Sequence, residues 1–187
     1  MKSKLSRVLL VIFSLGALVV MFATRFRVLV SPHQYTQSEL LALEAFPYDD
    51  WEHVRTQSVD AEGRVDYGRL LGEREPLDRF VALIAYVGPI SRPALFRSEE
   101  QQRDYYVHAY NALVLFSRLD AWPGEAPEPS DSHFFYRTRF VIDGHKANLY
   151  ELEHQFLRNE FPDLFLPNAE GSQRWNWSLA ESSPSAD

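Results

Sequence analysis

The chain has 187 residues, enough for one domain, and its composition, 45% hydrophobic and 14% aromatic, suits a protein with a packed core. It contains no cysteine, which excludes disulfides, thiolate nucleophiles and cysteine metal sites for this sequence. Five of the 19 basic residues lie within the first 27 positions, so 14 basic and 26 acidic residues remain from position 28 onward, a net charge of −12. Such a charge repels phosphate backbones, and we expect no nucleic-acid partner.

An uncharged apolar run extends from Val8 to Ala23, with basic residues before and after it. Its length lies near the lower end of the roughly 17 to 25 residues that a spanning helix needs. The absence of a small-residue cleavage pattern favours an uncleaved signal anchor over a cleaved signal peptide. The sequence therefore predicts a single-pass protein of the inner membrane, with the lipid bilayer as a partner through Val8 to Ala23 and the C-terminal domain outside the cytoplasm.

Four regions are expected along the chain. Residues 1–27 form the cytoplasmic tip and transmembrane helix, and residues 28–59 a membrane-proximal linker with one short helix. Residues 60–165 form the compact domain. Residues 166–187 are rich in polar residues and are predicted to be disordered.

The compact domain combines helical patterns with one hairpin pattern. Apolar residues at spacings of three and four follow Glu75-Pro76, which predicts an amphipathic helix that ends at Gly88-Pro89. Asp143-Gly144 between two short extended segments predicts a tight β-hairpin, and Asn148 with Glu151 predicts a capped helix from about Leu149 to Arg158. The expected fold class is α+β, a small and mostly helical domain with a short β-hairpin, preceded by one transmembrane helix.

The strongest helical pattern after the N-terminus runs from Glu99 to Leu119, behind a capping signal at Ser98. Asp104, His108 and Asn111 share one stripe of this helix, because they are spaced by four and three residues. His108 and Asn111 are expected at the core boundary. A buried amide or imidazole that is left unpaired costs roughly 1 to 3 kcal/mol, so both are expected to be hydrogen-bonded.

Glu153 is expected on the buried face of the helix that begins near Leu149. His108, Asn111 and Glu153 therefore form the candidate polar cluster, either as paired core groups or as a catalytic or ligand site. Asp104 and His108 are four residues apart and are weak candidates for metal ligands. They lack a third ligand nearby in the sequence, so we expect no metal and no cofactor.

Three blocks of sequence carry a resemblance to a known family. They are Val65-Asp66-Tyr67, the helical segment Ala109-Tyr110-Asn111-Ala112-Leu113, and Ile142-Asp143-Gly144 leading to Leu149-Tyr150-Glu151-Leu152-Glu153-His154. Together, over residues 60–160, they resemble the domain-of-unknown-function 547 family. The resemblance implies an exported or membrane-tethered α+β domain without a settled activity, with Asn111 and Glu153 at motif positions and His108 where asparagine is common.

The chain departs from the family pattern after Arg158. Longer members continue into a strand with a histidine and then a Cys-Pro segment, similar to papain- or transglutaminase-type chemistry, and this sequence has neither. The resemblance thus implies a C-terminally truncated or divergent member. Missing strands would leave sheet edges unpaired, which predicts either marginal stability or a protein partner that completes the domain.

Two functions follow from the sequence. The first is a membrane-anchored extracytoplasmic domain that acts as a non-catalytic binding or scaffolding module. The alternative is a degenerate or incomplete papain/transglutaminase-like hydrolase or acyl-transfer enzyme that lacks its cysteine and uses His108, Asn111 and Glu153. The sequence has no cysteine and no serine or threonine in an elbow such as Gly-x-Ser-x-Gly, which favours the first function over an enzyme.

Overall fold

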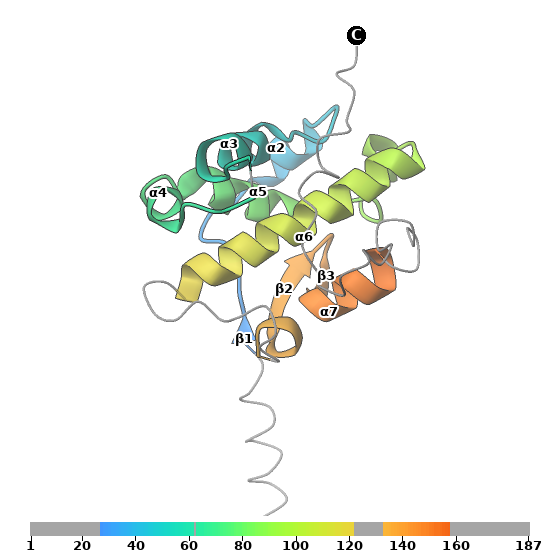
Figure 1. Ribbon diagram of the computed structural model, residues 1–187. Helices are drawn as coiled ribbons and strands as arrows, with labels where there is room; N and C mark the ends of the chain where they lie inside the picture. The colour runs from blue at the N-terminus through green and yellow to red at the C-terminus, as the bar shows by residue number, and fades with distance from the viewer. Residues whose placement is uncertain (1–26, 62, 122–132, 158–187) are drawn as a thin grey trace, which may run out of the picture.

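Helix α6, Glu99–Ala121, runs through the middle of the molecule. The structure is a computed structural model that describes residues 27–61, 63–121 and 133–157. In Figure 1 the helices that precede α6 lie on one side of it, and the β-hairpin and the helix after it lie on the other. The helix predicted from Glu99 to Leu119 is confirmed. Its capping signal is also present, because Ser98 Oγ accepts from the Gln101 N–H at 3.2 Å and Gln101 Oε1 accepts from the Ser98 N–H at 3.2 Å.

The helices on the first side are short except for one. They are α2 (Gln37–Leu41), α3 (Asp49–Ser58), α4 (Tyr67–Gly72), α5 (Glu75–Tyr86) and the 3₁₀ turn Pro93–Leu95. Helix α5 has a proline in its first turn, as predicted, and its apolar positions are buried: Leu77, Phe80, Val81, Ile84 and, just after the helix, Val87. These residues form the middle of the core.

Three strands lie on the other side of α6. They are β1 (Arg27–Val28), β2 (Thr138–Ile142) and β3 (His145–Asn148), in the order β1-β2-β3, with β1 parallel and β3 antiparallel to β2. The predicted hairpin is confirmed, since Asp143 and Gly144 form its turn with φ values of 51° and 78°. A wide helical turn, His133–Arg137, precedes β2.

The helix predicted from Leu149 begins as α7 (Leu149–Glu151) and continues with wider π-type winding as Leu152–Leu157. Its predicted cap is confirmed. Asn148 Oδ1 accepts from the Glu151 N–H at 2.7 Å, and Glu151 Oε2 accepts from the Asn148 N–H at 3.1 Å. This reciprocal pair orients the helix where the chain leaves β3.

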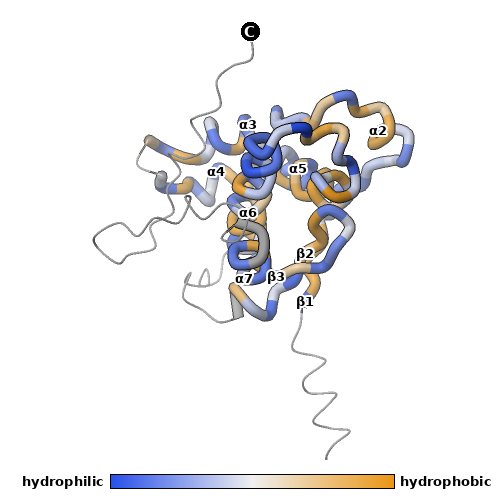
Figure 2. The backbone as a smooth tube through the Cα atoms, turned by 90° about the vertical axis from the view of Figure 1, so that its right-hand side faces the viewer, coloured by the Kyte–Doolittle hydropathy of each residue, from blue (hydrophilic) through white to orange (hydrophobic). Residues whose placement is uncertain are grey.

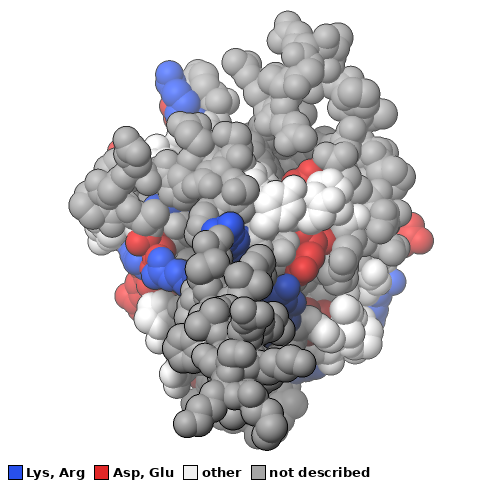
Figure 3. Space-filling view, turned by 90° about the horizontal axis from the view of Figure 1, so that it is seen from below, with Lys and Arg blue, Asp and Glu red and all other residues white. Residues whose placement is uncertain are grey.

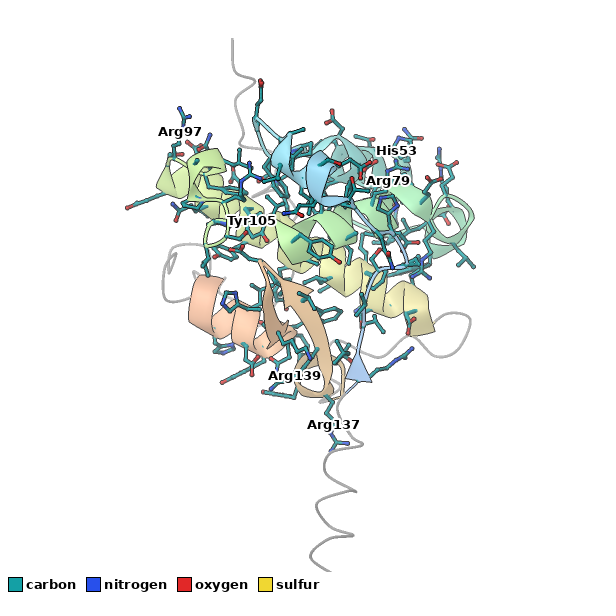
Figure 4. All side chains as sticks on the ribbon, turned by 180° about the vertical axis from the view of Figure 1, so that it is seen from behind. His53, Arg79, Arg97, Tyr105, Arg137 and Arg139 are labelled. Carbon is teal, nitrogen blue, oxygen red and sulfur yellow. The ribbon has the colours of Figure 1, made fainter. Side chains whose placement is uncertain are left out.

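The tip of the hairpin is tied to the end of α5. The N–H groups of Asp143 and Gly144 donate to the carbonyls of Ile84 and Ala85 at 2.8 and 2.9 Å. The Asp143 carboxylate, 2% exposed, accepts from the N–H groups of Ile90 and Ser91 at 2.6 and 2.9 Å. We call these four bonds the hairpin clasp. Tyr105 of α6, which lies beside the hairpin tip in Figure 4, donates its hydroxyl to the same Ile84 carbonyl at 3.0 Å.

The segment predicted as a linker, residues 28–59, contributes to the core. Trp51 and Val54 of α3 are 0% and 1% exposed and pack in the same core as α5 and α6. The apolar pattern of α3 in the sequence is weak. Figure 2 shows that α3 is mostly hydrophilic, whereas α5 and β2 are mostly hydrophobic. Two apolar side chains in a ten-residue helix do not make a clear amphipathic repeat.

The expected membrane topology is corrected. Among the helices of the described residues, none combines the length and the apolar character needed to cross a bilayer. The 23-residue α6 is long enough but carries polar groups such as Asp104, His108 and Asn111. The expectations of a fold class with a transmembrane helix, of a signal anchor and of a single-pass inner-membrane protein are therefore not upheld. The run from Val8 to Ala23, on which they rested, and the tail 166–187 lie outside the described residues.

Candidate functional site

His108 is buried between α6 and α3. The indole Nε1–H of Trp51 donates to His108 Nδ1 at 2.8 Å, and the imidazole is 6% exposed. An imidazole nitrogen that accepts a hydrogen bond carries no proton, so the neutral ring holds its proton on Nε2. The ring of Tyr48 approaches His108 edge-on, with 5.2 Å between the ring centroids. The packing thus selects one tautomer and one orientation.

The surroundings of His108 disfavour its charged form. Burial lowers the pKa of His108 to about 4, opposed in part by the nearby Glu52 and assisted by Arg55. Burial also raises the pKa of Tyr48, and Asp104 adds to that effect. Both rings are therefore neutral at physiological pH, His108 as a donor through Nε2 and Tyr48 as a hydroxyl.

Asn111 follows His108 by one helical turn and is 7% exposed. The sequence predicts that its amide is hydrogen-bonded, but the described part of the chain provides no partner for it. The backbone of Asn111 lies within α6, so only its side-chain amide lacks a hydrogen-bond partner. Its amide atoms are not among the fully buried atoms that lack a partner, so the amide keeps some contact with solvent. Asn111 thus differs from the satisfied core group that the sequence suggests.

Glu153 lies on the other flank of α6. Its burial, at 8% exposure, confirms the predicted helix face. Its Oε2 accepts from the Tyr110 hydroxyl at 3.4 Å. Successive residues of an α-helix are rotated by about 100°, so the side chains of Tyr110 and His108 leave α6 about 200° apart. The structure therefore brings His108 and Asn111 together, and places Glu153 with Tyr110 instead.

Asp104 lies at the rim of the His108 side of α6. Its side chain is 24% exposed, and Oδ1 is 3.8 Å from Nε of Arg103. Within the ranges that the structure describes, no group of three His, Asp or Glu side chains is arranged to hold a metal ion. The lone pair of His108 Nδ1 is already used by Trp51. On this side of α6, Asp104 thus contributes a carboxylate and His108 contributes the hydrogen-bond donor Nε2–H.

Two residues of α3, Trp51 and Arg55, complete this region, although the sequence pattern marks neither as functional. Trp51 orients His108. Arg55 donates from Nη2 to Glu52 Oε2 at 2.9 Å, while its Nε is buried without a hydrogen-bond partner in the described structure. The i, i+3 spacing of Glu52 and Arg55 is a signal for their pairing, but nothing in it points to α6. We define the α3–α6 polar cluster as Tyr48, Glu52, Arg55, Asp104, His108 and Asn111.

Two asparagines of similar burial give a direct test of this assignment. We expect Asn111→Leu to leave the free energy of unfolding unchanged or slightly higher, because its amide has no partner to lose and leucine buries more apolar surface. We expect Asn148→Leu to lower it by about 1 to 2 kcal/mol, because Asn148 caps α7. Urea unfolding of both variants makes the comparison. A loss in Asn111→Leu equal to that in Asn148→Leu would show that Asn111 has a structural partner.

The comparisons with known proteins add no relative. No protein-family model, no curated protein and no solved structure matches the chain. The resemblance to the domain-of-unknown-function 547 family therefore stays a prediction from its sequence blocks.

Proposed function

We propose that the chain is a non-catalytic binding module whose contact site is the α3–α6 polar cluster. The observation that carries this proposal is the hydrogen bond from Trp51 Nε1 to His108 Nδ1. A neutral imidazole has a single acceptor nitrogen, and here that nitrogen is occupied. His108 cannot take a proton from a substrate through Nδ1 without losing its bond to Trp51.

The electrostatics of His108 support the same function. A general base is most effective when its pKa lies near the working pH. Burial lowers the pKa of His108 to about 4, which leaves it a weak base at neutral pH. Glu153, the other titratable member of the predicted catalytic set, contacts Tyr110 on the opposite flank of α6. No contact in the described residues favours the alternative, an incomplete hydrolase or acyl-transfer enzyme.

The rim of the cluster supports a binding role. The side chains of Glu52, Arg55 and Asp104 are 44%, 23% and 24% exposed, so solvent reaches the cluster from one side. His108 and Asn111 project from α6, and the bond from Trp51 fixes the orientation of His108. Polar groups on rigid helices, with an accessible rim, are suited to hold a small polar group in a defined orientation. The protein partner expected to complete the domain remains a separate prediction.

Hydrolytic assays test this proposal. We expect the full chain to cleave an activated ester, such as p-nitrophenyl acetate, and an amide analogue no faster than buffer that contains free imidazole. We expect His108→Gln and the surface control His53→Gln to show the same rates. A rate for the wild type at least tenfold above background, lost in His108→Gln and retained in His53→Gln, would overturn the non-catalytic assignment.

A further inference from the structure

We infer that the ligand of the α3–α6 polar cluster carries a single carboxylate group. This inference rests on the proposed binding function, since it names the chemical class of the ligand at the same site. Three hydrogen-bond donors there lack partners in the described residues. They are Nε of Arg55, Nε2–H of His108 and the amide of Asn111.

The helical spacing places the three donors on the sides of α3 and α6 that the Trp51–His108 bond joins. Asn111 and His108 are three residues apart on α6 and therefore occupy one side of the helix, one turn apart. Arg55 is near enough to His108 to lower the pKa of the imidazole. The Trp51 that bonds His108 precedes Arg55 by four residues, so both project from one side of α3. An acceptor placed between α3 and α6 meets donors from both helices.

A carboxylate fits these donors better than a neutral acceptor does. Its two oxygens offer about four acceptor positions, and hydrogen bonds between charged and neutral partners are roughly twice as strong as neutral ones. The guanidinium of Arg55 uses Nη2 for Glu52, while its Nε–H keeps no partner in the described residues. Binding a carboxylate would thus satisfy the Nε–H of Arg55, whose burial without a partner is otherwise costly.

The local charge favours a monoanion over a dianion. Arg55 lies beside Glu52 and Arg103 beside Asp104, so the formal charges of these four groups cancel. A phosphate dianion gains no net attraction from such a set and meets two carboxylates at the rim. A carboxylate monoanion needs only the local donors.

No comparable set of unpaired donors lies at the opposite, lower end of the described structure. Arg27 Nη2 lies 2.8 Å from Asp120 Oδ2, and Arg139 Nη2 lies 3.5 Å from Glu151 Oε1. Seen from below, basic and acidic side chains of the described residues lie side by side (Figure 3). The α3–α6 polar cluster is therefore the site that we assign to the carboxylate.

The Trp51 indole provides the reporter for a test, because its N–H is bonded to His108. The full chain, labelled with ¹⁵N, is titrated at pH 7 with sodium acetate, N-acetyl-dialanine, the amide of that peptide, sodium phosphate and sodium chloride at matched ionic strength. The Trp51→Phe variant assigns the signal. We expect a saturable shift with at least one of the two carboxylates, none with the amide or chloride, and binding of phosphate at least tenfold weaker.

The two carboxylates distinguish the source of the group. Binding of acetate indicates a free small acid, and binding of the peptide acid alone indicates a chain terminus, and either outcome supports the inference. We expect Arg55→Met and Asn111→Leu to weaken binding at least tenfold, with Asn111→Asp as a variant of unchanged size that adds a repelling charge. Arg69→Met is the control, since Arg69 bonds Gln57, which is not a member of the cluster.

Three results would overturn the inference: no saturable shift with either carboxylate, an equal shift with the amide or chloride, or unchanged affinity in both Arg55→Met and Asn111→Asp. Each of them leaves the non-catalytic assignment untouched, because that assignment depends on the hydrolytic assays. Conversely, catalysis that depends on His108 would defeat the proposed function even if acetate were bound.

Discussion

Replacing Gly88 with alanine is expected to lower the free energy of unfolding by about 3 kcal/mol, because the new methyl group would collide with the hairpin clasp. A Cβ at position 88 would lie 2.5 Å from Cγ and 2.7 Å from Cβ and Oδ2 of Asp143. Asp143 is 2% exposed, and a shift away from the new methyl group would strain its bonds to Ile90 and Ser91. The substitution therefore combines overpacking with the loss of buried hydrogen bonds.

Gly72→Ala is the matched control for this prediction. Gly72 ends α4, and a Cβ there would have no atom within 4 Å. We expect its stability to equal that of the wild type or to exceed it by up to about 0.5 kcal/mol, because alanine restricts the unfolded chain. Urea unfolding measures both variants, and hydrogen exchange at the Ile90 and Ser91 amides reports on the clasp. Equal stabilities for Gly88→Ala and Gly72→Ala would contradict the close approach of Asp143 to Gly88.

Acidification is expected to destabilise the folded chain through His108. The pKa of His108 is lowered in the folded state from 6.5 to about 4. Above pH 6.5 the imidazole is neutral in both the folded and unfolded states. Below pH 6.5 the His108 imidazole binds a proton in the unfolded state but not in the folded state. The free energy of unfolding therefore falls as the pH is lowered to about 4. At about 1.36 kcal/mol for each pH unit, the total loss is about 3 kcal/mol.

The control for this prediction separates His108 from the carboxylates that also titrate in acid. Stability is measured by urea unfolding at intervals from pH 7.5 to 4 for the wild type, His108→Gln and His53→Gln. His53 lies on α3 with half of its side chain exposed, and Figure 4 shows it at the outer side of the helical layer. We expect the slope between pH 6.5 and 4 to be smaller in His108→Gln and unchanged in His53→Gln. Identical slopes in all three proteins would show that His108 is not buried in its neutral form.

Much of the fold on the side of β2 and α5 follows from local sequence. The repeat from Leu77 to Val87, the Asp143-Gly144 turn and the cap at Asn148 each specify their element through nearby residues, and each is confirmed. Helix α3 was missed because its burial depends on tertiary contacts of Trp51 and Val54 rather than on a repeating pattern. The π-type winding after Leu152 has no local signal either.

The candidate site was predicted only in part, for a similar reason. The spacing on α6 correctly grouped His108 with Asn111, because both lie on one helix. It could not show that Trp51 bonds His108 or that Tyr110 bonds Glu153, since those pairs are 57 and 43 residues apart in the chain. The sequence therefore suggested one cluster of three residues, where the structure has two separate pairs on opposite flanks of α6.

The ionisation state of His108 decides between a binding role and an acid–base role for the α3–α6 polar cluster. The measurement is an NMR titration of the His108 imidazole in the full chain, with ¹⁵N-labelled histidine, from pH 7.5 to 3.5. The account predicts a neutral ring with the proton on Nε2 at pH 7, a midpoint at about 4, and a midpoint nearer the ordinary histidine value in Trp51→Phe. A midpoint at or above about 6.5 in the wild type, or a proton on Nδ1, would contradict it and return His108 to the set of possible acid–base groups.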